Sequence, residues 1–380
     1  MRDQCKASRN NFIRVVIADA SRYARTLIAE AIVTEPDVVA IGSASSGQDA
    51  VRLVETLNPD LVLMGNHLTD LDGVQATHRI MSTCPTPILI VTDEPSEATF
   101  LAMTAGAVDT IASPACRQLS SREVRSRFIR RLKDAAKLGK RGVLNSRVRP
   151  RPREGMSNGC SMMLRASAER VAVVAMGAST GGPPCVLEIL SKLSREHSPP
   201  IVLTQHMAPQ FLPSFVTWLG AGIELQVQIA EHGSRLSPGN LYVAPGNATL
   251  RISEAKLVNT STACSVRFTE PSIDQMFESV ARVFGEHAIG VVLTGVGSDG
   301  ALGMKSMRES GALTVVQDQA SCLAHAMPRA ACELNAASLS ANPKQIAQLL
   351  RDIRHGTARE LPTTRPGNRR ALFEPERGGP

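Results

Sequence analysis

Aromatic residues are scarce in this 380-residue chain: they make up 3% of it, with a single tryptophan. Sites that bind single-stranded nucleic acid place aromatic side chains among basic ones, so that bases stack on them. No apolar run reaches the roughly 18 residues that a membrane span needs. Residues 1–12 have no apolar core after their basic residues, which argues against a secretory signal. We therefore expect no nucleic-acid partner and no membrane insertion.

Cysteine is scattered along the chain. There is no Cys-x-x-Cys pair among the eight cysteines, which stand at positions 5, 84, 116, 160, 185, 264, 322 and 332. This spacing indicates neither a zinc site nor a disulfide framework. We expect a protein of the reducing cytoplasm, with no metal and no cofactor.

Positive charge is concentrated in one segment. The net charge is +7, and residues 117–154 hold fourteen basic residues against three acidic ones. Such a segment can bind nucleic acid, anionic lipid or an acidic protein. Because it lacks interleaved aromatics, a solvated helix face followed by a linker is the simpler interpretation.

Two α/β patterns follow one another along the chain. Five short apolar runs, separated by helical patterns, lie within residues 12–114, and seven more lie between residues 170 and 341. Buried parallel strands have this appearance. We predict an N-terminal five-stranded parallel α/β domain at 12–138, a basic flexible linker at 139–167, a C-terminal doubly wound, mostly parallel α/β domain at 168–355, and a disordered tail at 356–380.

One apolar run stops at a serine in a glycine-rich turn, in the sequence VAVVAMGASTGG at residues 171–182. A phosphate-binding loop, a nucleophile on a tight turn and a plain connection are the three interpretations. The turn lacks the lysine of a P-loop, and Gln205-His206 stand where a dinucleotide-binding unit has an acidic residue. GASTG also matches the GxSxG turn that carries the nucleophile of α/β-hydrolases, whose catalytic residues follow the chain order Ser, acid, His. Here the histidine comes second, which excludes that family.

A serine nucleophile needs a base and an acid that orients the base. His206 ends the next apolar run, and Asp299 follows a later one in GVGSDG. Because the carboxyl ends of parallel strands meet at one edge of the sheet, Ser179, His206 and Asp299 are expected to converge there. His325 is the one competing base. The sequence predicts a catalytic triad.

Six motifs carry a resemblance to a known family. GASTGG, QHM, PGNLYVAPG, PSID, LTGVGSDGALGM and QDQASCLAHAMPR occur in this order within residues 169–350, which are similar to the catalytic domain of the CheB protein-glutamate methylesterases. The resemblance implies Ser179 as nucleophile, His206 as general base and Asp299 as orienting acid. It implies as substrate the methylated glutamates on the cytoplasmic domains of chemoreceptors, and relatives also deamidate glutamines there. Backbone N–H groups of Thr180 and Val296 are the expected oxyanion donors. Thr249 stands where the family often has histidine.

Residues 12–138 resemble a response-regulator receiver domain, which implies a flavodoxin-like fold. The resemblance lies in VVIAD, PDLVLMGNHLTDLDG, PILIVTD and GAVDTIASP. Receivers need an acidic pair with Mg²⁺, an acceptor aspartate, a hydroxyl and a lysine. Asp19 and Thr92 stand in two of these places, but Ala20, Gly65 and Ser113 occupy the others. We expect a degenerate receiver without a phosphoacceptor, which docks on the catalytic domain or binds a chemotaxis kinase or adaptor.

Together these features predict a cytoplasmic serine esterase of chemotaxis-type adaptation. The alternative is a non-catalytic signalling adaptor that docks on receptors.

Overall fold

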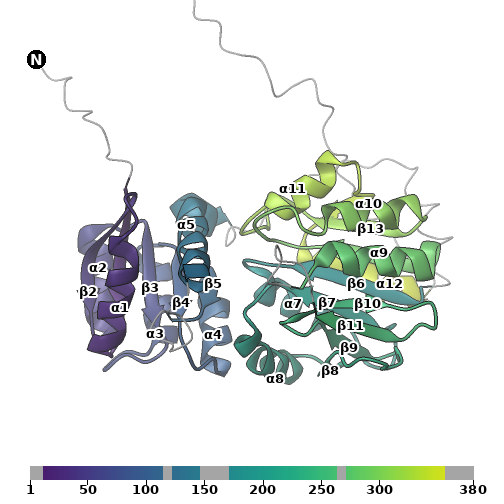
Figure 1. The fold of residues 1–380 in the computed structure, drawn as a ribbon, viewed down its shortest axis with the longest axis horizontal. Helices are drawn as coiled ribbons and strands as arrows, with labels where there is room; N and C mark the ends of the chain where they lie inside the picture. The colour runs from purple at the N-terminus through teal and green to yellow at the C-terminus, as the bar shows by residue number, and fades with distance from the viewer. Residues whose placement is uncertain (1–11, 114–121, 146–170, 263–270, 356–380) are drawn as a thin grey trace, which may run out of the picture.

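A computed structural model gives the structure, and it describes residues 12–113, 122–145, 171–262 and 271–355. Two α/β units lie side by side in Figure 1, and each has its own sheet. We call residues 12–145 the N-terminal unit and residues 171–355 the C-terminal unit.

The N-terminal unit has a five-stranded parallel sheet in the order β2-β1-β3-β4-β5. Every residue of the strands β3 and β4 is buried, as expected of parallel strands that helices cover on both faces. The predicted five-stranded parallel fold is confirmed. Its strands are β1 (Ile13–Ala18), β2 (Val38–Ala44), β3 (Leu61–Gly65), β4 (Ile88–Val91) and β5 (Asp109–Ile111), and its helices are α1 (Arg22–Val33), α2 (Gly47–Leu57), α3 (Gly73–Thr83), α4 (Glu97–Ala105) and α5 (Arg122–Asn145).

Helix α5 is the basic helix expected at the end of this unit. Phe128 and Leu132 on one face are buried, whereas Arg125, Arg130 and Lys137 are exposed. The helix is therefore amphipathic, with a solvated basic face. It runs to Asn145, past the boundary expected at residue 138. The rest of the predicted linker, 146–167, and the predicted tail, 356–380, lie outside the described residues.

The C-terminal unit has a seven-stranded sheet in the order β14-β13-β12-β6-β7-β9-β8, and every pair is parallel. The seven strands coincide with the seven apolar runs. They are β6 (Val173–Ala178), β7 (Ile201–Gln205), β8 (Gln226–Ile229), β9 (Asn240–Val243), β12 (Ala288–Val292), β13 (Leu313–Gln317) and β14 (Leu339–Ala341).

The helices of the C-terminal unit cover both faces of this sheet. They are α7 (Gly182–Leu190), α8 (Leu212–Gly222), α9 (Ile273–Phe284), α10 (Ala301–Glu309), α11 (Ala326–Glu333) and α12 (Pro343–His355), with short 3-10 turns at Pro209–Phe211 and Gly285–His287. An antiparallel ribbon of β10 (Ala248–Ile252) and β11 (Val258–Thr262), which the sequence analysis did not predict, packs beside α9.

Strand β6 lies in the middle of the seven-stranded sheet. The chain continues from β6 to β7 on one side, and later returns to β12 on its other side. In open α/β sheets, ligands and reacting groups gather at the carboxyl end of such a switch point. This is the edge at which the serine turn lies.

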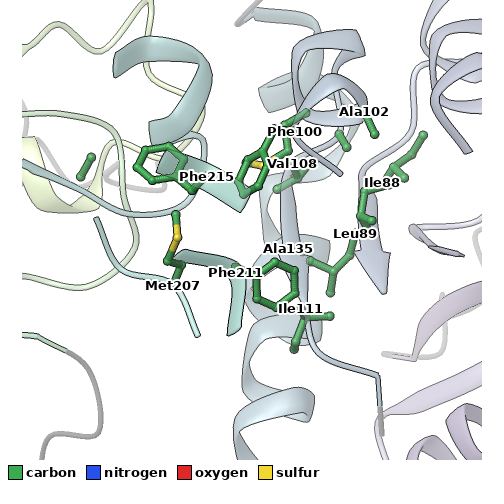
Figure 2. Packing of buried hydrophobic residues seen from close by; sticks show 14 of the residues in the cluster. Ile88, Leu89, Phe100, Ala102, Val108, Ile111, Ala135, Met207, Phe211 and Phe215 are labelled. Atoms are coloured by element: carbon green, nitrogen blue, oxygen red, sulfur yellow. The ribbon is translucent and has the colours of Figure 1, made fainter. Parts of the chain in front are cut away.

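The two units share an apolar contact. Figure 2 shows Phe100 of α4 close to Phe215 of α8, with a distance of 5.5 Å between the ring centroids. Phe100 also stacks on Trp218 at 5.3 Å, and Ser214 Oγ donates a 2.7 Å hydrogen bond to the Pro95 carbonyl. All three aromatic side chains are buried. The edge of the N-terminal unit made by α4, β5 and α5 therefore faces α7 and α8 of the C-terminal unit (Figure 1).

Candidate active site

Ser179 follows strand β6 at the start of a tight turn. We call residues 179–182 the serine turn. Gly181 has φ of +76°, a left-handed conformation that favours glycine, and helix α7 begins at the next residue. A Cβ at Gly181 would lie 2.8 Å from Leu323 Cβ. Backbone conformation and space thus both require glycine beside the nucleophile candidate.

The backbone of the serine turn is held from the two neighbouring strands. The Ser179 N–H donates to the Thr294 carbonyl after β12 at 3.1 Å, and the His206 N–H donates to the Ala178 carbonyl at 2.9 Å. Ala178 is paired with Gln205 in the register of β6 and β7. Ser179 and His206 therefore leave adjacent strands at the same level.

His206 and Asp299 are in direct contact. His206 Nε2 and Asp299 Oδ2 are 2.9 Å apart, and His206 is largely buried. These residues come from opposite sides of β6, because His206 follows β7 and Asp299 lies in the loop after β12. The structure brings together the predicted base and the predicted acid.

The Asp299 carboxylate also lies at the N-terminus of helix α9. Oδ2 accepts from the N–H of Ile273 at 2.8 Å, and Oδ1 accepts from the N–H of Asp274 at 3.0 Å and from Ser272 Oγ at 3.4 Å. Burial raises the pKa of Asp299, but the bond to His206 and the two N–H groups outweigh it, and the pKa lies below its ordinary value. Asp299 is thus held as a carboxylate beside the imidazole.

Helix α9 is positioned by two further residues. Thr249, at the place where the family often has histidine, is buried in β10, and its Oγ1 accepts from the Ser272 N–H at 3.3 Å. Asp274 accepts from the Gly303 N–H at 2.8 Å, in the first turn of α10. Thr249 therefore supports the helix end that holds Asp299.

His325, the competing base, also lies at this edge. Its backbone forms a bridge with Gly295, and it precedes the first residue of α11. Burial and the neighbouring Arg329 lower the pKa of His325. The carboxylate that orients an imidazole in this site contacts His206, which makes His206 the better base.

Thr180, one predicted oxyanion donor, lies within the serine turn, and Val296, the other, lies in the loop after β12. Within the described residues, neither backbone N–H donates a hydrogen bond to another residue. Thr180 is buried and Val296 is half-buried. Neither N–H is therefore committed to another residue of the described chain.

Asp109 is a residue near this site that the sequence analysis did not single out. The Thr180 hydroxyl donates to Asp109 Oδ2 at 2.8 Å, and Arg131 Nη1 pairs with the same oxygen at 2.8 Å. Asp109 lies on β5 and Arg131 on α5, so both belong to the N-terminal unit. A carboxylate of one unit therefore bonds the residue next to Ser179 in the other.

In the N-terminal unit, Asp19 and Gly65 lie beside each other at the carboxyl ends of β1 and β3. A Cβ at Gly65 would lie 2.3 Å from Asp19 Oδ2, so the Asp19 carboxylate fills the space of an acceptor side chain. Asp19 Oδ1 accepts from the Ser21 N–H at 2.7 Å, and burial raises the pKa of both Asp19 and Asp93. Ser113, at the lysine position, is buried.

Magnesium, which receiver domains use, does not fit this pocket. Mg²⁺ prefers several hard oxygen ligands in octahedral geometry. Within the described residues, no group of three or more His, Cys, Asp or Glu side chains is placed to hold a metal. Asp19 is turned onto a backbone N–H instead.

Comparisons with known proteins agree with both units. Residues 174–350 match the family model described as CheB methylesterase, and residues 15–121 match that of the response regulator receiver domain. Protein-glutamate methylesterase/protein-glutamine glutaminase 4 of Geobacter metallireducens is 37% identical over 351 residues, which are 90% of this chain and 99% of that protein. A Caulobacter vibrioides protein, protein-glutamate methylesterase/protein-glutamine glutaminase 1, is 34% identical over 90% of this chain and 98% of its own length.

A solved structure is also similar in sequence. The catalytic domain of Thermotoga maritima CheB methylesterase is 29% identical and covers 49% of this chain and 98% of its own, with a TM-score of 0.46. Among the described residues, no helix combines the length and apolar content needed to cross a bilayer.

Proposed function

This chain belongs to the CheB methylesterase family, and we propose that it hydrolyses glutamate methyl esters through Ser179, His206 and Asp299. The observation that supports the triad most is the 2.9 Å contact between His206 and Asp299, on either side of the strand that ends at Ser179. The proposed substrates are methylated glutamates on the cytoplasmic domains of chemoreceptors, and the proposed place of action is the cytoplasm.

The contact between His206 and Asp299 supports a role for each ring nitrogen of His206. Nε2 contacts the Asp299 carboxylate, so this nitrogen carries a proton and Nδ1 is the basic atom. Nδ1 takes the Ser179 hydroxyl proton as Oγ attacks the ester carbonyl. The imidazolium then gives that proton to the departing methoxide oxygen, the C–O bond breaks, and methanol leaves an acyl-enzyme.

Water completes the reaction by the same groups. Nδ1 takes a proton from water as its oxygen attacks the acyl-enzyme carbonyl, and the proton returns to Ser179 Oγ when the acyl bond breaks. The products are glutamic acid and methanol. In both steps the N–H groups of Thr180 and Val296 stabilise the negative oxygen, and the loss of one such donor costs about 3 kcal/mol.

Glutamine deamidation is a second activity of the same site. The curated relatives carry both activities in their names. An amide would form the same acyl-enzyme with ammonia as the leaving group. Release of ammonia from a receptor with glutamine at the modified position, measured beside methanol release, gives the balance between the two.

Methanol release from methyl-labelled receptor membranes tests the enzyme against the adaptor alternative. We expect Ser179→Ala to lower the rate on the order of a million-fold, while Ser191→Ala, at the exposed end of α7, leaves it unchanged. An adaptor would bind receptors equally well in both variants and release no methanol. Equal methanol release by wild type and Ser179→Ala would refute the proposed nucleophile.

For the N-terminal unit we propose docking without an aspartyl-phosphate switch, either on the C-terminal unit or on a chemotaxis kinase or adaptor. Gly65 offers no carboxylate, and Asp19 fills the pocket. Incubation with acetyl phosphate and Mg²⁺ should give no acid-stable, base-labile adduct. Such an adduct on this unit would overturn the proposal.

A further inference from the structure

Gln205, the last residue of β7, joins the backbone of the nucleophile to that of the base. Its side chain is 3% exposed. Nε2 donates to the Ser179 carbonyl at 2.9 Å and to the His206 carbonyl at 3.2 Å. One amide group therefore connects the serine turn to the residue that carries the imidazole.

The bond to the Ser179 carbonyl also fixes the direction of a catalytic N–H. The Ser179 carbonyl and the Thr180 N–H belong to one peptide group, which is planar and trans, so the two point in opposite directions. The Gly182 N–H donates to the same carbonyl at 2.8 Å. Two donors on the carbonyl side thus hold the Thr180 N–H pointing away from them.

The amide of Gln205 also has a buried oxygen, Oε1, without a hydrogen-bond partner in the described residues. An unsatisfied buried acceptor costs stability. An apolar side chain of the same size would avoid this cost but would also lose both bonds of Nε2, which connect the serine turn to His206.

Gly182 provides the space for this side chain. A Cβ at Gly182 would lie 2.2 Å from Gln205 Oε1 and 2.8 Å from Ala178 Cβ. The backbone conformation of Gly182 is not left-handed, so the space, and not the conformation, requires glycine. Gly182 and Gln205 therefore depend on each other.

We propose that Gln205 is a positioning residue, which aims the Thr180 N–H at the oxyanion and holds the serine turn at a fixed distance from His206. This inference rests on the proposed function, because it assigns a role within the same triad site. Gln205 itself touches neither the substrate nor the reacting atoms in this role.

Two substitutions of Gln205 test the proposal. Gln205→Met keeps the volume and removes both donors together with the orphan oxygen, and Gln205→Glu keeps the shape and removes the donors. Each should lower kcat for methanol release about 100-fold, the scale of one displaced oxyanion donor, with KM within about twofold. Gln205→Met should have the thermal unfolding midpoint of wild type, so this variant alone tests the proposal if Gln205→Glu does not fold. The control is Gln226→Glu, an exposed strand residue that Arg195 contacts, which should keep full activity.

Gly182→Ala tests the same idea from the other side. It should lower kcat because its methyl group displaces the Gln205 amide. In the Gln205→Met background the amide is already absent and only the close approach to Ala178 Cβ remains. Gly182→Ala should therefore cause a smaller loss there than in the wild type, so the two effects are not additive.

The outcomes separate this inference from the proposed function. A folded Gln205→Met variant with wild-type kcat, beside an inactive Ser179→Ala variant, would overturn the role of Gln205 and leave the triad intact. A loss confined to KM, or full additivity with Gly182→Ala, would also contradict it. Activity that survives Ser179→Ala would instead refute the proposed function itself.

Discussion

The hydroxyl of Thr180 offers a direct test of how the two units act on each other. It donates to Asp109 Oδ2 at 2.8 Å across the contact, and both residues are more than nine-tenths buried. Thr180→Val removes this hydroxyl and keeps the shape of the side chain and its backbone N–H. Thr180→Ser keeps the hydroxyl and is the matched control.

The size of the effect follows from the charge on the acceptor. A hydrogen bond to a charged group contributes about 1.5 to 3 kcal/mol. Removing it should raise the ratio of undocked to docked molecules roughly 10- to 150-fold, at about 1.4 kcal/mol for each factor of ten. The apolar contact around Phe100 and Phe215 remains and keeps part of the docking.

We expect Thr180→Val to increase esterase activity as well as the undocked fraction. The docked N-terminal unit contacts the residue beside Ser179, so, under the proposed function, we expect a receptor helix to reach the site more readily in the undocked state. When a competent state is a minor one, the apparent affinity for its ligand scales with its population. We expect Thr180→Val to raise kcat/KM for methylated receptor by up to the same factor, with a smaller change for a short peptide methyl ester.

Hydrogen exchange provides the structural readout. Amide exchange in β5 and α8 should be faster in Thr180→Val than in wild type or Thr180→Ser. If Thr180→Val shows wild-type exchange in both elements and unchanged kcat/KM on receptor, the Asp109 contact does not control access to the site.

Three further predictions concern the C-terminal unit. Asp299→Asn should lower kcat about 10⁴-fold, because the imidazole loses the acceptor that fixes its tautomer; a loss below tenfold in methanol release would contradict the assigned acid. Burial and the charge of Asp299 raise the pKa of Asp274 to about 6, so Asp274 contributes stability below its unfolded pKa of 3.8 that is lost as the pH rises through 6. Measured by urea unfolding, the free energy of unfolding of Asp274→Asn should therefore rise relative to that of wild type between pH 4 and pH 7. A difference in this free energy that stays constant with pH would exclude the titration of Asp274. Gly181→Ala should lower the free energy of unfolding by about 1 to 3 kcal/mol through backbone strain, and further through a clash with Leu323. Gly233→Ala is the control and should cost less, because Gly233 has a φ of +83° but nothing lies within 4 Å of its Cβ. Equal losses of stability in the two variants would show that Leu323 does not contribute.

Much of the fold was predictable because parallel strands buried on both faces appear as continuous apolar runs. All twelve strands of the two main sheets fall within the predicted runs, including β2 and β8, which are only partly buried. The ribbon β10–β11 was missed because its residues, ATLRI and VNTST, mix polar and apolar side chains. Helix α5 runs past the boundary expected at residue 138, and neither Gly139 nor Gly142 ends it, since a single glycine costs a helix only about 1 kcal/mol.

The site was predictable only in part, for a related reason. The rule that polar residues gather at the carboxyl ends of parallel strands identified Ser179, His206 and Asp299 from order alone. It gives no information on Asp109, because that contact depends on how two units pack. Gln205 was also missed as a site residue, since its role depends on where one side-chain amide points.

The N-terminal unit combines the frame of a receiver with a glycine at the acceptor position, Gly65, beside which the Asp19 carboxylate lies. Its pocket lies at the carboxyl ends of β1 and β3, whereas its bonds to the serine turn come from Asp109 on β5 and Arg131 on α5. A partner that acts directly on the contact between the two units would therefore bind the edge made by α4, β5 and α5. A protein that binds this edge would compete directly with the C-terminal unit, and its concentration, not phosphoryl transfer, would then set the fraction of open enzyme.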